Sequence, residues 1–198
     1  HSEARRHYFS SNVEKDYKQY AMTFIVHHEK PHEGTAVEHF MSTGPFAILP
    51  LKDQNRSSIV WTVEEDLWPV LNNLPREEFI AIAQDNFGEF LGEIDIEGDI
   101  AGFPLKAYET DKYFNKSIVL IADTAHVIHP LAGKGLNQGI KDIDCFADLL
   151  LAYGAGDDML KQYEESRKTD NSTMLEITDA INTVFSNDSK ILQIGRQD

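Results

Sequence analysis

The 198-residue chain carries 18 Lys and Arg against 33 Asp and Glu, which gives a formal net charge of −15. This charge argues against nucleic acid and anionic lipid as main partners, because both require clustered basic side chains. With 41% hydrophobic residues, the composition is that of a globular protein. The single cysteine, Cys145, excludes an internal disulfide, and no apolar run reaches the roughly 20 residues needed to span a bilayer.

Residues 18–64 are predicted to form an antiparallel sheet. Turn-like breaks separate short runs that are rich in β-branched and aromatic residues. These runs are Ala21–His28, Thr35–Met41, Phe46–Leu51 and Ser57–Glu64. A helix is predicted over 76–92, with Pro75 where it begins, and a further pair of extended segments is expected within 93–108.

The next part of the chain has a different pattern. Ser117–Ala122 is a continuous apolar run, which predicts a strand buried on both faces. A glycine-containing loop follows, and apolar residues at helical spacing then predict a helix from about Leu136. A second long helix is expected over Asp157–Phe185.

Acidic residues are concentrated in 76–111. This segment contains ten acidic residues and only two basic ones, Arg76 and Lys106, which gives a net charge of 2 − 10 = −8. We interpret this segment as a solvated face. A binding surface for a basic partner is the alternative.

The apolar run and the loop after it carry the strongest indication of a ligand site. The run ends in Asp123, and ligands of open α/β sheets bind beyond the carboxyl ends of the strands. Gly133 and Gly135 would let the backbone approach a flat or phosphate-bearing ligand closely. The helix from Leu136 would direct its amino end at the same place, where it favours negative charge.

The stretch DTAHVIHPLAGKGLNQGIKD at 123–142 resembles the second flavin-binding motif of the FAD-dependent aromatic hydroxylases. That motif is approximately GDAAH-x-x-HP-x-AGQG-x-N-x-G-x-x-D, and the stretch is most similar to that of the polyprenyl-phenol hydroxylases of ubiquinone biosynthesis. The resemblance extends to GPFAILPL at 44–51, which is similar to a strand of the family's substrate domain, and to 163–188, which is similar to its C-terminal helix. Ser2 and Arg5 fit the tail of the family's DG-x-x-S-x-x-R motif.

The resemblance implies which residues bind FAD. Asp123 would hold the ribityl chain, and the helix from Leu136 would stabilise charge on the pyrimidine edge of the flavin. The full set implied is Arg5, Asp123, Pro130, Ala132, Gly133, Lys134, Gly135, Leu136 and Asn137. No side chain is assigned as a catalytic acid or base, and no metal ligand is predicted.

The resemblance also implies the fold class and the activity. The fold would be α/β (α+β), with a mixed or antiparallel substrate-binding sheet and one helix in 1–108, and the C-terminal half of a Rossmann-like FAD domain in 109–198. The protein would be a monooxygenase that uses NAD(P)H and O2 to hydroxylate the aromatic ring of a polyprenyl phenol in ubiquinone biosynthesis. We expect it to be cytoplasmic, with at most a peripheral association with the inner membrane. Assembly as a homodimer or within a biosynthetic complex is left open.

The sequence departs from the family pattern in three ways. Ala122 replaces a glycine, which we expect to crowd the approach to the flavin slightly. Lys134 replaces a glutamine; it either faces the flavin and stabilises its reduced anion or, the reading we favour, points to solvent. The G-x-G-x-x-G loop that binds the ADP half of FAD is absent. We therefore expect the C-terminal portion of a hydroxylase, which alone is inactive and holds FAD weakly or not at all.

Two other functions compete with this interpretation. A metal site could use Asp123 with the histidines, but His-x-x-His on a loop is not a zinc spacing by itself. The histidines concerned are His27, His28, His32, His39, His126 and His129. We expect His126 instead to hydrogen-bond within its loop. The second alternative is a non-catalytic binding or regulatory module that works through the acidic segment.

A hydrolase is disfavoured by the absence of a G-x-S-x-G elbow. Cys145 lies within an apolar helical pattern, where a core position is expected rather than a nucleophile.

Overall fold

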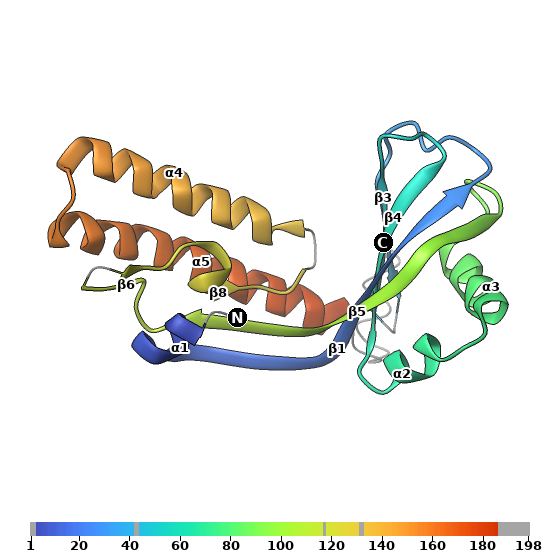
Figure 1. Cartoon of the computed structure of the whole chain (residues 1–198), viewed down its shortest axis with the longest axis horizontal. Helices are drawn as coiled ribbons and strands as arrows, with labels where there is room; N and C mark the ends of the chain where they lie inside the picture. Colours follow the sequence, from blue (N-terminus) through green and yellow to red (C-terminus); the bar gives the residue numbers. More distant parts are fainter. Residues whose placement is uncertain (1–2, 42–43, 117, 131–132, 186–198) are drawn as a thin grey trace. The chain divides into compact units, whose positions relative to one another are not determined.

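The computed structural model describes residues 3–41, 44–116, 118–130 and 133–185 (Figure 1). The strands are β1 (Ser11–His28), β2 (Val37–Met41), β3 (Gly44–Pro50), β4 (Arg56–Glu64), β5 (Ile94–Thr110), β6 (Phe114–Asn115), β7 (Ile118–Val119) and β8 (His126–Val127). The helices are α1 (Glu3–Tyr8), α2 (Leu67–Asn72), α3 (Arg76–Phe87), the 3₁₀ turn η1 (Ala122–Thr124), α4 (Gly135–Tyr153) and α5 (Asp157–Phe185).

The chain divides into two compact units. Unit 1 combines the residues up to Tyr17 with Lys106–Asn182, and unit 2 is built from Lys18–Leu105. The long strands β1 and β5 therefore contribute to both units. Lys18 has φ +56°, so β1 is locally irregular where it passes from one unit to the other. The N-terminal residues thus cluster with the C-terminal part of the chain, although the sequence analysis groups them with the first domain.

Unit 2 contains the antiparallel sheet that the alternating runs predict. The strand order is β2-β3-β4-β1-β5, and the full sheet adds β8, which pairs with the part of β5 that belongs to unit 1. Ile59 of β4 lies opposite both Phe24 of β1 and Ile48 of β3. Helices α2 and α3 cover one face of this sheet (Figure 1). Their buried residues join those of the strands in one core: Met22, Phe24, Val26, Phe46, Ile48, Ile59, Trp61, Val63, Leu71, Phe79, Ala83, Phe87, Leu91, Ile94 and Ile96.

Three details of unit 2 differ from the prediction. Helix α3 starts after Pro75 as expected but ends at Phe87, because Gly88 takes φ +80°. The short helix α2 was not predicted. The segment 93–108 forms the single strand β5 rather than two strands, because Gly98, at φ +71°, deflects the strand without reversing it.

In unit 1 the two long helices form as predicted. Helices α4 and α5 lie side by side (Figure 1), and a small core lies beneath them, with Tyr113, Leu120, Ala125 and Tyr163 buried. Cys145 packs against this core, as expected. The predicted strand at Ser117–Ala122, however, is wrong in extent. Only Ile118–Val119 is a strand; it pairs with β6 and is half-buried, because the chain then turns into η1.

The buried and the apolar residues of helix α4 lie on different faces. Its inner face holds Gln138, Gly139 and Asp142, which are buried. The predicted apolar stripe lies on the other face and is exposed: Leu136, Ile140, Ile143, Ala147 and Leu150. Within the described ranges, no helix combines the length and the apolar character needed to cross a membrane.

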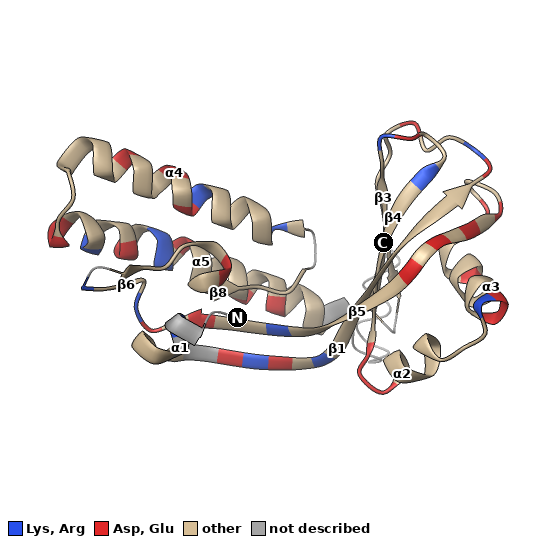
Figure 2. Ribbon diagram, in the orientation of Figure 1, with Lys and Arg blue, Asp and Glu red and all other residues tan. Residues whose placement is uncertain are grey.

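The acidic segment is spread along α3 and β5 (Figure 2). Its exposed members are Glu77, Glu78, Asp85, Glu89, Glu93, Asp95, Glu97 and Asp99. Glu97 is paired with Arg56 at 2.6 Å and with His27 at 2.9 Å. Glu109, by contrast, is buried in unit 1. The exposure of the eight acids fits both the solvated face and the alternative, a binding surface for a basic partner.

Candidate functional site

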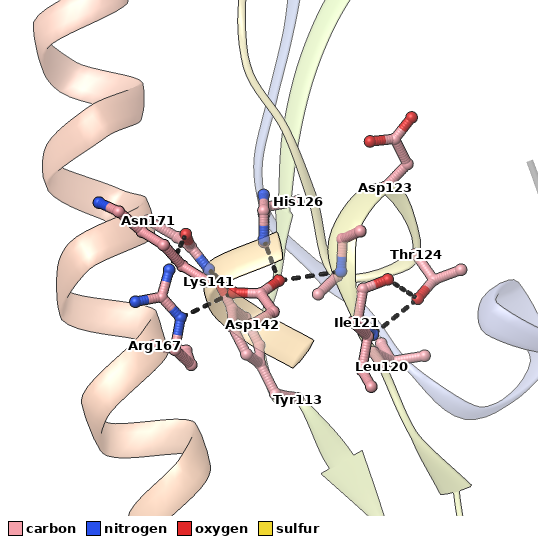
Figure 3. A network of polar contacts seen from close by, with 12 residues as sticks. Tyr113, Leu120, Ile121, Asp123, Thr124, His126, Lys141, Asp142, Arg167 and Asn171 are labelled. Carbon is pink, nitrogen blue, oxygen red and sulfur yellow. Dashed lines mark hydrogen bonds and ion pairs between the residues drawn. The ribbon is translucent and has the colours of Figure 1, made fainter. Parts of the chain in front are cut away.

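The first part of the site is the turn that carries Asp123. The Asp123 carboxylate is exposed and points away from the polar side chains behind the turn (Figure 3). The Thr124 hydroxyl closes the turn, because it accepts the Ile121 N–H at 2.9 Å and donates to the Ile121 carbonyl at 2.7 Å. Ala122 adopts φ +53°, a left-handed conformation that is unfavourable for a residue with a Cβ. The turn therefore presents one carboxylate to solvent from a strained backbone.

The second part is the amino end of α4. The Gln138 N–H donates to the Lys134 carbonyl at 3.1 Å, so the N–H groups of 135–137 precede the first helical hydrogen bond. Lys134 occupies the N-cap position and makes no side-chain capping bond. Gly133 has φ +60°, and a Cβ at Gly133 or Gly135 would meet no atom of the described chain within 4 Å. This helix end can therefore accept a ligand group that carries negative charge.

Arg5 and Tyr108 lie behind the Asp123 turn. The Tyr108 hydroxyl donates to the Asp123 carbonyl. The Arg5 guanidinium stacks over the Tyr108 ring, 4.2 Å from its centroid, and Arg5 is only 9% exposed. Burial raises the pKa of the Tyr108 hydroxyl, so it remains a donor at neutral pH. Arg5 thus supports the turn from within the unit.

A buried polar network joins the turn to both long helices (Figure 3). Asp142 of α4 has no exposed surface, and its Oδ2 accepts the Ala122 N–H at 2.9 Å and His126 Nε2 at 2.7 Å. Its Oδ1 accepts Arg167 Nε at 2.8 Å and Asn171 Nδ2 at 3.2 Å, both from α5. One carboxylate thus satisfies donors from three elements of the unit.

The network keeps Asp142 ionised. Burial alone would raise the pKa of its carboxyl, but the hydrogen bonds from His126 and Arg167 outweigh this effect and lower the pKa to about 2. The charge is balanced by Arg167, which is itself buried. A buried ion pair of this kind destabilises the folded state little only while every hydrogen-bond donor to the carboxylate remains in place.

The two histidines of the loop have separate roles. His126 bonds to Asp142 on α4 rather than within its own loop, which corrects the expected partner. His129 is fully buried with its ring edge-on to Tyr17, 4.7 Å between centroids, and burial lowers its pKa to about 4.

The other histidines bond mainly to the protein backbone. His28 contacts the Lys30 carbonyl at 2.7 Å, and His32 contacts the Leu51 carbonyl at 3.0 Å. In the described part of the chain, no three His, Cys, Asp or Glu side chains are grouped so that they could hold a metal ion.

The structure brings together most of the residues implied by the motif. Asp123 and the amino end of α4 are linked because η1 packs against this helix. Pro130, Gly133, Lys134, Leu136 and Asn137 are exposed, Gly135 is half-buried and Arg5 is buried. The exposure of Lys134 fits both expectations for its side chain, because a bound flavin would also lie at this open surface. Ala132 lies outside the described residues.

The Ala122 methyl group lies on the inner side of the turn. A Cβ placed on Gly139 of α4 would approach it to 2.7 Å, so the methyl group faces the helix.

Sequence reasoning did not assign a role to Asp142 or identify its partners. Asp142 matches the motif, which is the one signal that singles it out. Arg167 and Asn171 stand four residues apart, so they share one face of α5, but nothing in the sequence shows that this face is buried. Tyr108 could not be connected with Asp123 without the strand pairing that places Tyr108 opposite Val127.

Comparison with known proteins supports FAD, the ligand that the motif at 123–142 implies. The family described as FAD binding domain matches residues 5–178. The chain is 41% identical over 187 residues to the ubiquinone hydroxylase UbiL of Rhodospirillum rubrum, covering 91% of this chain and 43% of the relative. It is 32% identical over 186 residues to the 3-demethoxyubiquinol 3-hydroxylase of Escherichia coli, covering 91% of this chain and 47% of the relative. Among solved structures it is similar to PqsL, a probable FAD-dependent monooxygenase from Pseudomonas aeruginosa, with a TM-score of 0.70, 18% identity and coverage of 88% and 50%.

These matches confirm the resemblance on which the sequence analysis relied, together with the fold class and FAD as the cofactor. At 18% identity, the likeness to PqsL shows the fold alone. The chain spans about half the length of the curated relatives that it matches.

Proposed function

This chain belongs to the family of FAD-binding domains, and on that premise we propose that the whole protein is a flavin-dependent hydroxylase. Its substrate would be a small aromatic ring, a phenolic precursor of ubiquinone that carries a polyprenyl tail. The names of the relatives from R. rubrum and E. coli support this substrate class. The observation that carries the proposal is the exposed Asp123 turn, packed against a helix whose amino end is uncapped and open.

The residues present fit the flavin half of FAD. The Asp123 carboxylate would accept hydrogen bonds from ribityl hydroxyls, since it is exposed and not engaged in the network behind it. Gly133 and Gly135 would let the backbone lie against the flat ring, because no described atom fills the space beside them. The N–H groups at 135–137 would stabilise negative charge on that ring.

FAD, when bound, would supply the redox chemistry, with NAD(P)H as reductant and O2 as oxidant. The chain's own contribution would be to orient the cofactor and to keep water from the reacting atoms. We propose unit 2 as the substrate-binding domain, because its sheet and the similar strand at 44–51 correspond to the family's substrate domain. Arg5 would act with Tyr108 to keep the Asp123 turn in place.

The protein would be cytoplasmic, with at most a peripheral association with the membrane, either as a homodimer or in a biosynthetic complex. The 198-residue chain by itself would hold FAD weakly, since its sequence contains no G-x-G-x-x-G loop for the ADP half.

The test is FAD binding and turnover by the full-length protein. We expect a yellow protein that oxidises NAD(P)H in the presence of a prenylated phenol. Replacing Asp123 by Ala should weaken FAD binding about tenfold or more, whereas Asp148→Ala, an exposed carboxylate further along α4, should not. A full-length protein that binds no FAD, or an Asp123→Ala variant with unchanged affinity, would overturn the proposal.

A further inference from the structure

We propose that Asp142 is a positioning residue, whose buried carboxylate holds the 121–124 turn in the conformation that directs Asp123 at the cofactor. This inference rests on the proposed function. It assigns to Asp142 a task that can be tested separately from FAD binding as such.

The first argument is where the donors to Asp142 lie along the chain. Its Oδ2 binds the N–H of Ala122 and the ring of His126, the residues that bracket Asp123 on either side. A single oxygen atom therefore contacts the chain within the turn, just before Asp123, and again in β8, three residues after Asp123. The other oxygen, Oδ1, is fixed by Arg167 at 2.8 Å, so the carboxylate itself cannot rotate freely.

The second argument is that the turn needs an external hold. Ala122 at φ +53° stays in a sparsely populated region only where the surrounding structure over-determines it. The bonds between Thr124 and Ile121 lie within the turn and move with it. Tyr108 anchors the turn to β5 through the Asp123 carbonyl. Asp142 is the contact that fixes the backbone before Asp123 to α4.

The third argument concerns the two halves of the site. Asp142 lies about two turns beyond Gly135, the first residue of α4. By binding the Ala122 N–H it sets the spacing between the Asp123 turn and the amino end of this helix. Both parts must contact one ligand at the same time, since the ribityl chain is joined directly to the flavin ring, so a change in that spacing would weaken at least one of the contacts.

Asp142 does not itself face the ligand. Its side chain has no exposed surface, and Figure 3 shows the Asp123 carboxylate directed to the opposite side of the turn. It therefore acts through Asp123 and is not a catalytic residue.

A carboxylate is required because only donors converge on it. A carboxylate is acceptor-only and can receive several bonds on two oxygens. Asparagine has nearly the same shape but presents an NH2 group in place of one oxygen. In Asp142→Asn this group must face donors, either the Ala122 N–H and His126 or the Arg167 guanidinium. The turn then loses its hydrogen bonds to α4, or Arg167 of α5 loses its carboxylate acceptor.

The experiment is a double-mutant cycle on FAD affinity, measured in the full-length protein by quenching of flavin fluorescence. If Asp142→Asn reduces the population of the competent turn to about a tenth, the apparent Kd rises about tenfold. In the Asp123→Ala background there is no carboxylate to direct, so Asp142→Asn should then change the Kd less than about twofold. Equal effects in both backgrounds, or no effect in either, would overturn the inference. A wild-type protein that binds no FAD would instead refute the proposed function, and this inference with it.

Glu109→Gln is the matched control. Glu109 is a carboxylate of the same unit, 4% exposed, that accepts the hydroxyls of Tyr113 at 2.9 Å and Ser172 at 2.8 Å without touching the turn. This variant should lower the melting temperature but leave the Kd for FAD unchanged. A tenfold loss of affinity here would mean that any buried change in the unit affects FAD, and would overturn the inference.

If Asp142→Asn does not fold, His126 carries the test. In His126→Gln the amide N–H can replace the Nε2 donor, whereas His126→Phe removes it. We expect the glutamine variant to bind FAD with an affinity close to wild type and the phenylalanine variant several-fold more weakly. The same affinity in both variants would contradict the assignment.

Discussion

Because Ala122 and Gly139 are in contact, we predict that the effect of Gly139→Ala on stability changes sign when Ala122 is replaced by glycine. Ala122 has a strained φ of +53°, and its methyl group occupies the space into which a Cβ on Gly139 would project, at 2.7 Å. Carbon atoms in proteins do not approach so closely, and neither a backbone-attached methyl group nor a helix can move aside easily. We therefore expect Ala122→Gly and Gly139→Ala to be strongly coupled.

The magnitudes follow from three effects. A left-handed alanine costs about 1–2 kcal/mol, and a glycine costs about 0.5–1 kcal/mol in conformational entropy, so Ala122→Gly should stabilise the protein by about 1 kcal/mol. Gly139→Ala gains about 1 kcal/mol of helix propensity but overpacks the contact at a cost of about 2 kcal/mol. Without the methyl group of Ala122, the new Cβ lies 3.6 Å from its Cα, an ordinary contact.

Gly139→Ala should therefore destabilise the wild type by about 1 kcal/mol and stabilise Ala122→Gly by about 1 kcal/mol, a coupling of about 2 kcal/mol. Urea unfolding of the four proteins, followed by circular dichroism, measures each free energy of unfolding. Additive effects, or a stabilising Gly139→Ala in the wild type, would show that the turn and α4 are not packed as described.

Two further predictions concern the surroundings of the site. Burial lowers the pKa of His129 from 6.5 to about 4, so between these pH values the unfolded chain binds a proton that the folded chain does not. The free energy of unfolding should accordingly fall by about 3 kcal/mol as the pH drops from 7 to 4, and His129→Phe should flatten this part of the pH profile. Equal pH profiles for the wild type and the variant would contradict this prediction. Tyr108→Phe removes the hydroxyl that donates to the Asp123 carbonyl, so it should cost about 1 kcal/mol of stability and weaken FAD binding to the full-length protein, whereas Tyr20→Phe, in unit 2, should not change FAD affinity.

The regular elements were predictable because apolar residues repeat at helical spacing in α4 and α5, and short runs rich in β-branched and aromatic residues mark the strands of unit 2. The prediction for β5 was wrong in one respect. The expected pair of extended segments within 93–108 is one strand, which Gly98, at φ +71°, bends without reversing. The short α2 contains Pro69 and is too short to show a helical repeat, so nothing in the sequence marks it clearly.

The sequence could predict that α4 is a helix, but not which of its faces is covered. Its stripe of large apolar residues suggests the buried face, yet Leu136 and Ile143 are exposed, and the buried face carries Gln138 and Asp142. The reason is that the inner face fits closely to the turn at Ala122 and to the polar side chains of α5. Such a fit depends on contacts between residues that are distant in the sequence. The periodicity of one helix carries no information about those contacts.

The motif identified the Asp123 turn and the glycine loop, which are local in sequence, so their proximity followed from a short segment. The supports of the turn come from elsewhere. Arg5 and Tyr108 lie far from Asp123 in the sequence, and Arg167 lies on the last helix. Their roles in supporting the turn depend on strand pairing and helix packing, which is why the sequence indicates none of these roles, although the motif does single out Arg5.

The central claim, that the amino end of α4 and the loop before it receive the flavin, can be tested most directly by amide hydrogen exchange. The full-length protein would be compared with and without FAD, with occupancy monitored by its visible spectrum. We predict that FAD slows exchange in the segment 135–137, where the N–H groups have no helical partner, and leaves exchange in α3 of unit 2 unchanged. Bound FAD with unchanged exchange over 135–137 would contradict the account.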